Sequence, residues 1–190
     1  MNALSWNCRG ICNASTVRAS KAQIRGILPD FVVLCEMKAS DKRMKEVMNS
    51  LGFSYRQVIE AKGFAGGLCM MWRANDLVEG LEYNKNMIAI QVSDKLSKWV
   101  LVGFYGPTYP AKNSKAWGNL SALLESFSCP WICIDDFNCT LSQDERFGGS
   151  RGSSSAVNHL KDLMFEFSAI DLGSSSNKFT GEKENGGEPL

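Results

Sequence analysis

Histidine is almost missing from this chain of 190 residues, since His159 is the only one. A structural zinc site needs four ligands, which are mostly cysteine and histidine. Two Cys-x3-Cys pairs occur, Cys8 with Cys12 and Cys129 with Cys133, but neither has the usual zinc-ribbon spacing. The seven cysteines are an odd number, so we expect free thiols that pack as small apolar side chains rather than a disulfide framework.

Long apolar segments and export signals are also missing. No apolar run reaches the roughly 18 residues that a membrane span requires. The start of the chain, Met1–Arg9, does not have the charged-then-apolar pattern of a signal peptide. We therefore expect an intracellular protein, nuclear or cytoplasmic, that is neither secreted nor embedded in a membrane.

Neither sign of charge dominates, because 21 Lys and Arg face 20 Asp and Glu. The charge is uneven: residues 1–62 hold ten basic and five acidic residues, and the remainder holds 11 and 15. A modestly basic amino-terminal half attracts phosphate, although a solvated surface explains it more simply and the dense basic stripe of a dedicated nucleic-acid binder is missing. With 44% hydrophobic residues, a length of 190 favours a single globular domain.

Strand-like and helix-like segments alternate along the chain. One helix is predicted from a cap at Ser15 or Thr16 to Pro29, with Val17, Ile24, Ile27 and Leu28 on one face, and others over Asp41–Leu51, Ser114–Phe127 and 157–167. Strands are predicted over Ala3–Asn7, Phe31–Cys35, Ser54–Ile59, Gly67–Trp72, Leu77–Tyr83, Met87–Val92, Trp99–Tyr105 and Trp131–Asp135. Helices that flank a run of closely spaced strands favour an α/β or α+β layered sandwich with a mixed, largely antiparallel sheet.

Two segments have the composition of loops. Gly148–Ser155 is rich in glycine and serine. From Gly173 to Leu190 the apolar periodicity is lost, and Gly, Ser, Asn, Lys and Glu predominate. We therefore expect one domain over residues 1–172 and a mostly disordered tail over residues 173–190.

Polar side chains follow several of the predicted strands. They are Asn7, Glu36, Tyr105 and the run Asp135–Asn138. Ligands collect at the carboxyl ends of strands in α/β sheets, and carboxylate and amide oxygens suit Mg²⁺ or Mn²⁺ better than zinc or copper. The pattern indicates a metal-assisted hydrolysis of phosphoesters. Acidic residues that merely form turns after strands would explain the same spacing.

Five segments of the sequence carry a family resemblance when they are taken together. In chain order they are SWNCRG (Ser5–Gly10), CEMK (Cys35–Lys38), GGL with a following MW (Gly66–Trp72), GFYGP (Gly103–Pro107) and PWICIDDFN (Pro130–Asn138). From about residue 3 to residue 180 the chain resembles the endonuclease/exonuclease/phosphatase family, and within it the apurinic-endonuclease-like domain of plant LINE-type retrotransposons. The resemblance implies a four-layer fold, with two mixed β-sheets face to face and helices outside.

The resemblance also implies an activity, which is cleavage of DNA phosphodiesters with Mg²⁺ or Mn²⁺ by a monomer without an obligate protein partner. Glu36 matches the metal ligand of the family, and Asn7 matches an asparagine that arranges the metal and the hydrogen bonds around it. Tyr105 matches a tyrosine that donates to the phosphate. Asp136 matches the aspartate that orients or deprotonates the attacking water, and Asn138 matches the partner that fixes the nucleophile and the phosphate.

Three further residues are implied less directly. Lys38 follows the family pattern and is expected to assist phosphate binding, as is Arg9, which stands where some repair-type relatives have an acidic residue. Asp135 occupies the place of a family glycine. We expect its side chain to crowd the turn and to repel Asp136, which raises the proton affinity of one carboxylate or strengthens cation binding, with Asp135 as an additional metal ligand.

The end of the sequence departs from the family pattern. Phe179-Thr180 is followed by Gly181 rather than tryptophan, and neither the later Asp-containing strand nor a Ser-Asp-His segment follows. His159 falls outside the apolar stripe of its predicted helix, so we expect a surface histidine and no substitute. These features predict a domain that is incomplete at its C-terminus, with weak or no activity and an exposed edge on its second sheet.

Two alternatives to a nuclease remain at this point. One is a non-catalytic remnant that binds metal or nucleic acid. The other is a small-molecule or lipid phosphatase of the same superfamily, although the sequence shows no clear lipid or inositol signature.

Overall fold

The computed structural model describes residues 1–61, 66–73, 78–93, 97–107, 113–139, 141 and 158–173. The chain separates into two compact units, Met1–Asn138 and Cys139–Leu190. In the second unit the described part contains one helix, α4 (His159–Glu166). The first unit contains the other elements: β1 (Ala3–Asn7), α1 (Ala14–Ile27), β2 (Phe31–Cys35), α2 (Asp41–Leu51), β3 (Tyr55–Ile59), β4 (Leu68–Trp72), β5 (Val78–Asn84), β6 (Met87–Ser93), β7 (Lys98–Phe104), α3 (Asn113–Glu125) and β8 (Trp131–Ile134).

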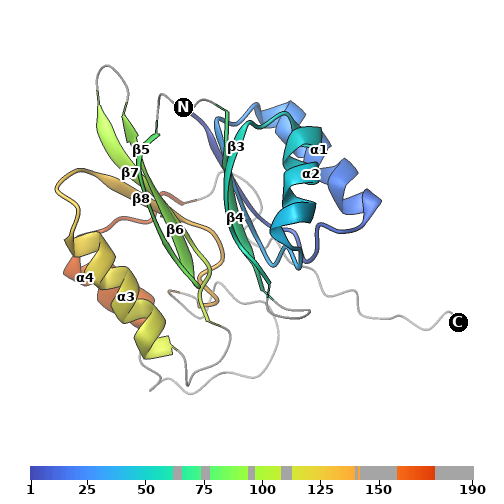
Figure 1. Ribbon diagram of the computed structural model, residues 1–190. Coiled ribbons are helices and arrows are strands. Elements are labelled where there is room, and N and C mark those ends of the chain that lie inside the picture. Colours follow the sequence, from blue (N-terminus) through green and yellow to red (C-terminus); the bar gives the residue numbers. More distant parts are fainter. Residues whose placement is uncertain are drawn as a thin grey trace, which may run out of the picture. The chain divides into compact units, whose positions relative to one another are not determined.

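The strands of the first unit form two four-stranded sheets, with orders β1-β2-β4-β3 and β5-β6-β7-β8. Within each sheet one pair is parallel, β1 with β2 and β7 with β8, and the other pairs are antiparallel. Both sheets are therefore mixed, as the sequence predicts. Figure 1 shows the sheets facing each other, with α1 and α2 outside one sheet and α3 outside the other.

The core between the sheets comes from alternate positions on the central strands, because successive side chains of a strand point to opposite faces. Its buried residues are Phe31, Val33, Cys35, Leu68, Met70, Trp72, Ile88, Ile90, Val92 and Leu101. At Gly103 on β7 the sheets approach closely, since an added Cβ would lie 2.8 Å from a methyl carbon of Val33 on β2. Glycine at this position sets the local distance between the sheets.

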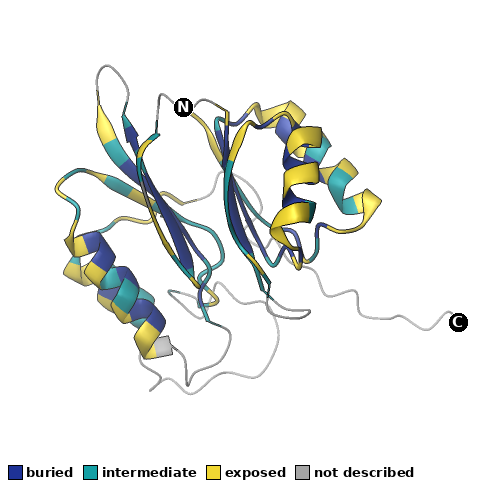
Figure 2. Cartoon of the chain, viewed as in Figure 1, coloured by how far each residue is buried: buried dark blue, intermediate teal, exposed yellow. Residues whose placement is uncertain are grey.

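The opposite face of the first sheet packs against α1 and α2. Val32, Leu34, Cys69 and Met71 of the sheet form one cluster with helical residues that include Ile24, Met44, Val47, Met48 and Leu51. On the second sheet, the Phe104 ring of β7 packs against Trp117 of α3 at 5.0 Å between centroids. Figure 2 shows the resulting pattern, with buried residues along the central strands and exposed residues on the outer faces of the helices.

The predicted elements agree with the structure to within a few residues, and α2 has the predicted bounds, with Gly52 as its left-handed C-cap. The predicted start of α1 is wrong. Asn13 caps this helix by accepting the N–H of Thr16, so the helix begins at Ala14. Its apolar face is also narrower than expected, because Ile27 and Leu28 are 40% and 70% exposed.

The structure also bears on the predictions about the cysteines and about membrane spans. Cys8, Cys35 and Cys69 are buried thiols, as expected, but the expectation is wrong for Cys12, which is exposed, and Cys129 and Cys133 are only partly buried. The predicted loop Gly148–Ser155 and the predicted tail beyond Gly173 lie outside the described residues. No helix in the described part of the chain has both the length and the apolarity to cross a membrane.

The two parallel pairs determine where the functional residues lie. Because β1 and β2 run in the same direction, the residues that follow them, Cys8 and Glu36, emerge at one edge of the first sheet. In the same way, β7 and β8 bring Tyr105 and Asp135 to one edge of the second sheet. Hydrogen bonds between these two edges define the candidate site.

Candidate active site

The centre of the site is the side-chain amide of Asn7, at the end of β1. Its Nδ2 atom donates to Glu36 Oε1 at 3.1 Å and to Asp136 Oδ2 at 2.8 Å. An amide nitrogen carries two hydrogens, so one neutral group holds two carboxylates. Glu36 follows β2 in the first sheet and Asp136 follows β8 in the second. Asn7 therefore joins the two sheets and brings two like charges close together.

Glu36 reaches this position through an unusual backbone. Its φ of 50° lies in the left-handed region, which costs about 1–3 kcal/mol for a residue with a side chain and occurs where the surroundings enforce it. Here Cys8 N–H donates to Cys35 O at 3.1 Å, and Ile11 N–H donates to Met37 O at 2.9 Å. These two bonds fasten the segments that follow β1 and β2 to each other on either side of Glu36.

Tyr105 belongs to the same network. Its hydroxyl donates to Glu36 Oε1 at 3.3 Å, from just beyond the end of β7. Partial burial, together with the nearby Glu36 carboxylate, raises the pKa of Tyr105 above its ordinary value of 10.0. The phenol thus stays protonated in neutral solution and serves as a hydrogen-bond donor.

Asn138 and Asp136 are held by the backbone of Gly106. The Gly106 N–H donates to Asp136 O at 2.8 Å, and Asn138 Nδ2 donates to Gly106 O at 2.7 Å. The Asn138 N–H in turn donates to Asp136 Oδ1 at 3.0 Å. A Cβ at Gly106 would overlap the carbonyl group of Phe137, so only glycine allows these two segments to lie so close.

Phe137 anchors the same segment on its other side. Its ring lies 5.9 Å from that of Phe104 on β7 and stacks at 6.1 Å on Trp117 of α3, measured between centroids. Aromatic pairs at this spacing contribute about 0.5–1.5 kcal/mol beyond their buried area. The residue between Asp136 and Asn138 is thus part of the packing of the second sheet against α3.

Asp135 is outside the network around Asn7. Its Oδ1 atom accepts the hydroxyl proton of Ser5 at 2.9 Å, and its Oδ2 atom is shielded from solvent with no hydrogen-bond partner among the described residues. Its φ of 113° is a conformation that suits glycine. The structure therefore explains why a glycine would be favoured here, and it directs the Asp135 carboxyl group toward Ser5 rather than toward Glu36.

The surroundings of Asp135 change its acidity. Burial, assisted by the negative charge of Asp136, raises the pKa of Asp135 from 3.8 to about 6, although hydrogen bonds from Cys35 and Ser5 act in the opposite direction. The sequence predicts a higher proton affinity for one of the two carboxylates through mutual repulsion. The shift has that direction, but its largest cause is desolvation rather than charge.

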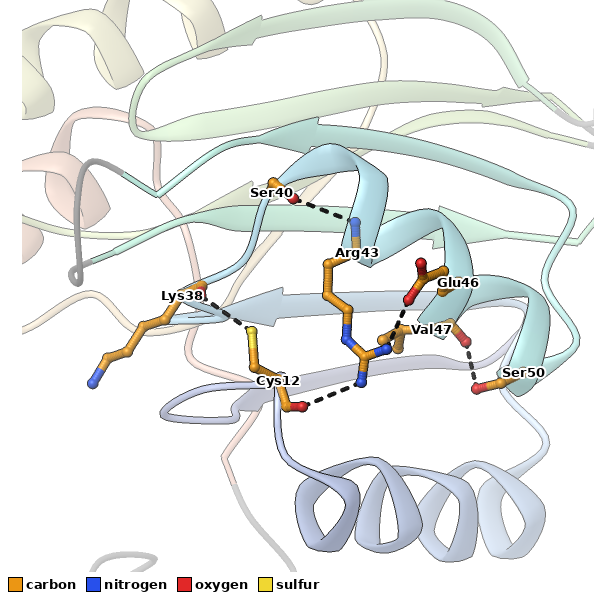
Figure 3. A network of polar contacts seen from close by, with 7 residues as sticks. All are labelled: Cys12, Lys38, Ser40, Arg43, Glu46, Val47 and Ser50. Carbon is orange, nitrogen blue, oxygen red and sulfur yellow. Dashed lines mark hydrogen bonds and ion pairs between the residues drawn. The ribbon is translucent and has the colours of Figure 1, made fainter.

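Arg9 and Lys38 lie on the loops beside the site, and both are exposed. The Arg9 N–H donates to Asn7 Oδ1 at 3.3 Å. Figure 3 shows that Lys38 contributes its carbonyl oxygen to a network with Cys12 and Arg43, while its side chain points away from that network. Their backbones are therefore fixed near the site, and their cationic groups extend into solvent.

The donors at the site are suitable for a hard divalent cation. Among the described residues, no group of three or more His, Cys, Asp and Glu side chains is arranged as a metal site. Mg²⁺, however, usually takes one or two carboxylates and keeps several waters. Glu36 and Asp136, which the Asn7 amide holds near each other, supply two carboxylates of that kind. A cation there would also offset the repulsion between the two carboxylates.

The structure thus brings together four of the predicted residues directly, Asn7, Glu36, Tyr105 and Asp136, and attaches Asn138 to Asp136. Sequence reasoning missed Ser5, Gly106 and Phe137. The signal for Ser5 was its position two residues before Asn7, which places both side chains on the same face of a strand. His159 is the first residue of α4, in the second unit.

No protein-family model and no curated protein matches the sequence. Solved structures match its fold. The 3′ phosphatase NExo from Neisseria, bound to a product DNA hairpin, has a TM-score of 0.59 and 13% identity, covering 75% of this chain and 60% of that one. The APE2 catalytic domain from Xenopus laevis has a TM-score of 0.59 and 14% identity, covering 88% of this chain and 67% of that one. An AP endonuclease from Archaeoglobus fulgidus has a TM-score of 0.56 and 11% identity, covering 76% of this chain and 60% of that one.

These similarities show that the chain shares the α+β fold of these three proteins, with two mixed sheets and outer helices. The fold predicted from the sequence is confirmed. The chain spans about 60% of the length of the Neisseria and Archaeoglobus enzymes.

Proposed function

We propose that this chain is a nuclease-type domain that hydrolyses phosphodiesters of DNA with a divalent cation. The observation that carries the proposal is the bridge of Asn7 between Glu36 and Asp136, with Tyr105 on the same Glu36 oxygen. Support for DNA as the substrate comes from the similar structures, which include a phosphatase bound to a DNA hairpin and an AP endonuclease. The five sequence segments support an origin in a LINE-type retrotransposon, and we infer a monomer.

Glu36 and Asp136, assisted by Asn7, would hold the cation, for which Mg²⁺ or Mn²⁺ is the chemically suitable choice. When bound, such a cation polarises a phosphoryl oxygen and offsets the charge that develops during hydrolysis. Asp135 contributes no oxygen to the Asn7 network, since its carboxyl group is directed to Ser5. We therefore assign it no role as a ligand.

Side chains of this chain would orient the attacking water and donate hydrogen bonds to the phosphate. Asp136 has an N–H donor on each oxygen, from Asn7 and from Asn138. This arrangement fixes its carboxylate, as orientation of an attacking water requires. Tyr105 is a protonated phenol that can donate to a phosphate oxygen, and Arg9 and Lys38 supply exposed positive charge for the DNA backbone.

The expected rate for these 190 residues is low. They contain one histidine, His159, and no Ser-Asp-His segment, whose histidine contacts the scissile phosphate in the family that the sequence resembles. Loss of a single acid–base group typically costs about 10²–10⁴-fold in rate. The informative quantity is therefore the ratio of two DNA cleavage rates, that of the protein and that of a variant without the carboxylate of Glu36.

The test is nicking of supercoiled plasmid in Mg²⁺, Mn²⁺ or EDTA. Nicking is expected to require the cation and to disappear in Glu36→Ala. Glu46→Ala is the matched control, because Glu46 is an exposed glutamate on α2 that pairs with Arg43. Nicking that is equal in the protein and in Glu36→Ala would refute the assignment of the site.

A substrate panel separates the alternatives. Abasic DNA, intact plasmid and phosphoinositide vesicles would be compared under the same conditions. Hydrolysis of the lipid alone would favour a phosphatase of the same fold, and salt-sensitive DNA binding without cleavage in any metal would favour a non-catalytic binding protein.

A further inference from the structure

We propose that Ser5 and Asp135 form a tether between the two sheets that positions Asp136, so that both are positioning residues of the candidate site. The tether itself is a structural claim, and only its effect on reaction rate rests on the proposed function.

The first observation is a pair of parallel bonds between the sheets. Ser5 and Asn7 are two residues apart on β1 and so point to the same face. Ser5 Oγ donates to Asp135 Oδ1 at 2.9 Å, and Asn7 Nδ2 donates to Asp136 Oδ2 at 2.8 Å. Consecutive residues after β8 are thus bound to alternate residues of β1, and each bond supports the geometry of the other.

The second observation is the backbone of Asp135. A φ of 113° is rarely adopted by a residue with a side chain, and such conformations persist only where the surroundings enforce them. From the opposite sheet, the hydroxyl of Ser5 donates to this carboxyl group at 2.9 Å, and the thiol of Cys35 gives it a second, weaker side-chain contact. Without the Ser5 bond, the segment would be free to relax toward a more common φ.

Relaxation at Asp135 would move the next residue. The peptide that follows Asp135 carries Asp136, whose Oδ2 atom must stay within 2.8 Å of the Asn7 amide. The carbonyl of Asp136 is fixed by Gly106, so a change in φ at Asp135 would be taken up by rotation between these two points. The tether therefore acts on the site through Asp136, without contact with a substrate.

The test uses a signal that a purely structural role would not move. In ¹H–¹⁵N spectra of the full chain, the side-chain amide of Asn7 reports its bonds to Glu36 and Asp136. Ser5→Ala is expected to shift both proton signals of this amide, and Ser5→Thr, which keeps the hydroxyl, is expected to restore them. Ser20→Ala is the matched control, since Ser20 is a buried serine whose hydroxyl donates to Thr16 O on α1.

The nicking assay provides the second measurement. Ser5→Ala is expected to lower the rate about ten-fold or more, because small displacements of catalytic groups are costly, while Ser5→Thr retains most of it. In an Asp135→Gly background the φ of 113° needs no tether. There, Ser5→Ala is expected to have no further effect on the rate or on the Asn7 signals.

Two results would overturn the proposal. One is a Ser5→Ala variant that melts at a lower temperature yet keeps the Asn7 signals of the unmodified protein. The other is an effect of Ser5→Ala that persists undiminished with Asp135→Gly. If the unmodified protein does not nick DNA in any metal, the proposed function fails, and the Asn7 signals still decide the tether.

Discussion

The side chain of Asn138 is bonded to the main chain of Gly106, with its Nδ2 atom donating to the glycine carbonyl at 2.7 Å. The bond joins the segments that follow the parallel strands β7 and β8. The bond fixes the orientation of the Asn138 amide, because its nitrogen faces the Gly106 carbonyl. The geometry of the candidate site thus depends on a residue that has no side chain.

Substitution of Gly106 by alanine is expected to disrupt the site more than the fold. The added methyl group would overlap the Phe137 carbonyl, and the segment with Asp136 and Asn138 would have to move. Overpacking of this kind costs about 1–3 kcal/mol in free energy of unfolding, and a displacement of about 1 Å can cost about 10²-fold in rate. Thermal unfolding and plasmid nicking would measure the two effects.

Gly118→Ala is the control for this experiment. Gly118 lies within α3, and an alanine Cβ there meets nothing within 4 Å. Alanine is expected to stabilise the helix by about 0.5–1 kcal/mol and to leave nicking unchanged. If Gly106→Ala nicks DNA as fast as Gly118→Ala, the backbone of Gly106 does not position the site.

Asp135 is expected to make the stability of the metal-free protein depend on pH. Its pKa is about 6 in the folded state and 3.8 as the ordinary value, so between these pH values the folded protein binds more protons than the unfolded chain. The contribution of Asp135 to the free energy of unfolding is therefore greatest below about pH 4 and falls by roughly 3 kcal/mol as the pH rises to about 6 and beyond. Denaturant unfolding in EDTA across pH 4–8 would measure this change.

In Asp135→Asn the amide oxygen can still accept the Ser5 hydroxyl, but the titration is removed. We expect this variant to lose that fall in stability. Asp171→Asn, at an exposed carboxylate, serves as the control and is expected to keep the fall. A matching pH dependence in the protein and in Asp135→Asn would contradict the raised pKa.

Added Mg²⁺ or Mn²⁺ is expected to raise the melting temperature through Glu36 and Asp136. A ligand that binds only the folded state stabilises it by about 2.7 kcal/mol at 100 times its Kd. Glu36→Gln keeps an acceptor for Asn7 but loses the charge, so about ten-fold more cation should be needed for the same stabilisation. Glu46→Gln provides the comparison. An equal response of the two variants would place cation binding elsewhere.

Loss of the Tyr105 hydroxyl is expected to lower the rate without changing its pH dependence. Because the pKa of Tyr105 is raised above 10.0, the phenol stays protonated from pH 7 to 9, and its contribution as a donor is constant there. Tyr105→Phe should lose about 10²–10³-fold in nicking at each pH. Tyr83→Phe is the control, at an exposed tyrosine on β5. A loss that varies across this pH range would mean that Tyr105 acts by ionisation.

The strands and the places where they end could be predicted from the sequence because they depend on local patterns. The uninterrupted apolar runs Phe31–Cys35 and Leu68–Trp72 are fully buried in the structure. Residues after such runs meet at a common edge when strands are parallel, and this rule brought Asn7 and Glu36 together in the prediction.

The contacts that hold the site residues in position could not be predicted in the same way. The bond from Ser5 to Asp135 spans 130 positions in the sequence, and the contact of Gly106 with Phe137 exists only once β7 and β8 are paired. The prediction of where α1 starts was wrong for a local reason. Ser15 and Thr16 are both favourable caps, but Asn13, which precedes them, caps the helix. Helix-capping propensity alone does not decide among Asn13, Ser15 and Thr16, which lie within four positions of one another.

The ring of Phe137 connects α3 to the segment that carries Asp136 and Asn138. This ring stacks on Trp117 at 6.1 Å and stands between Asp136 and Asn138 in the chain. A change of packing on α3 would therefore reach the two neighbouring polar groups through one shared aromatic anchor. A substitution in this helix is therefore expected to shift Asp136 and Asn138 even though it changes no residue of the candidate site.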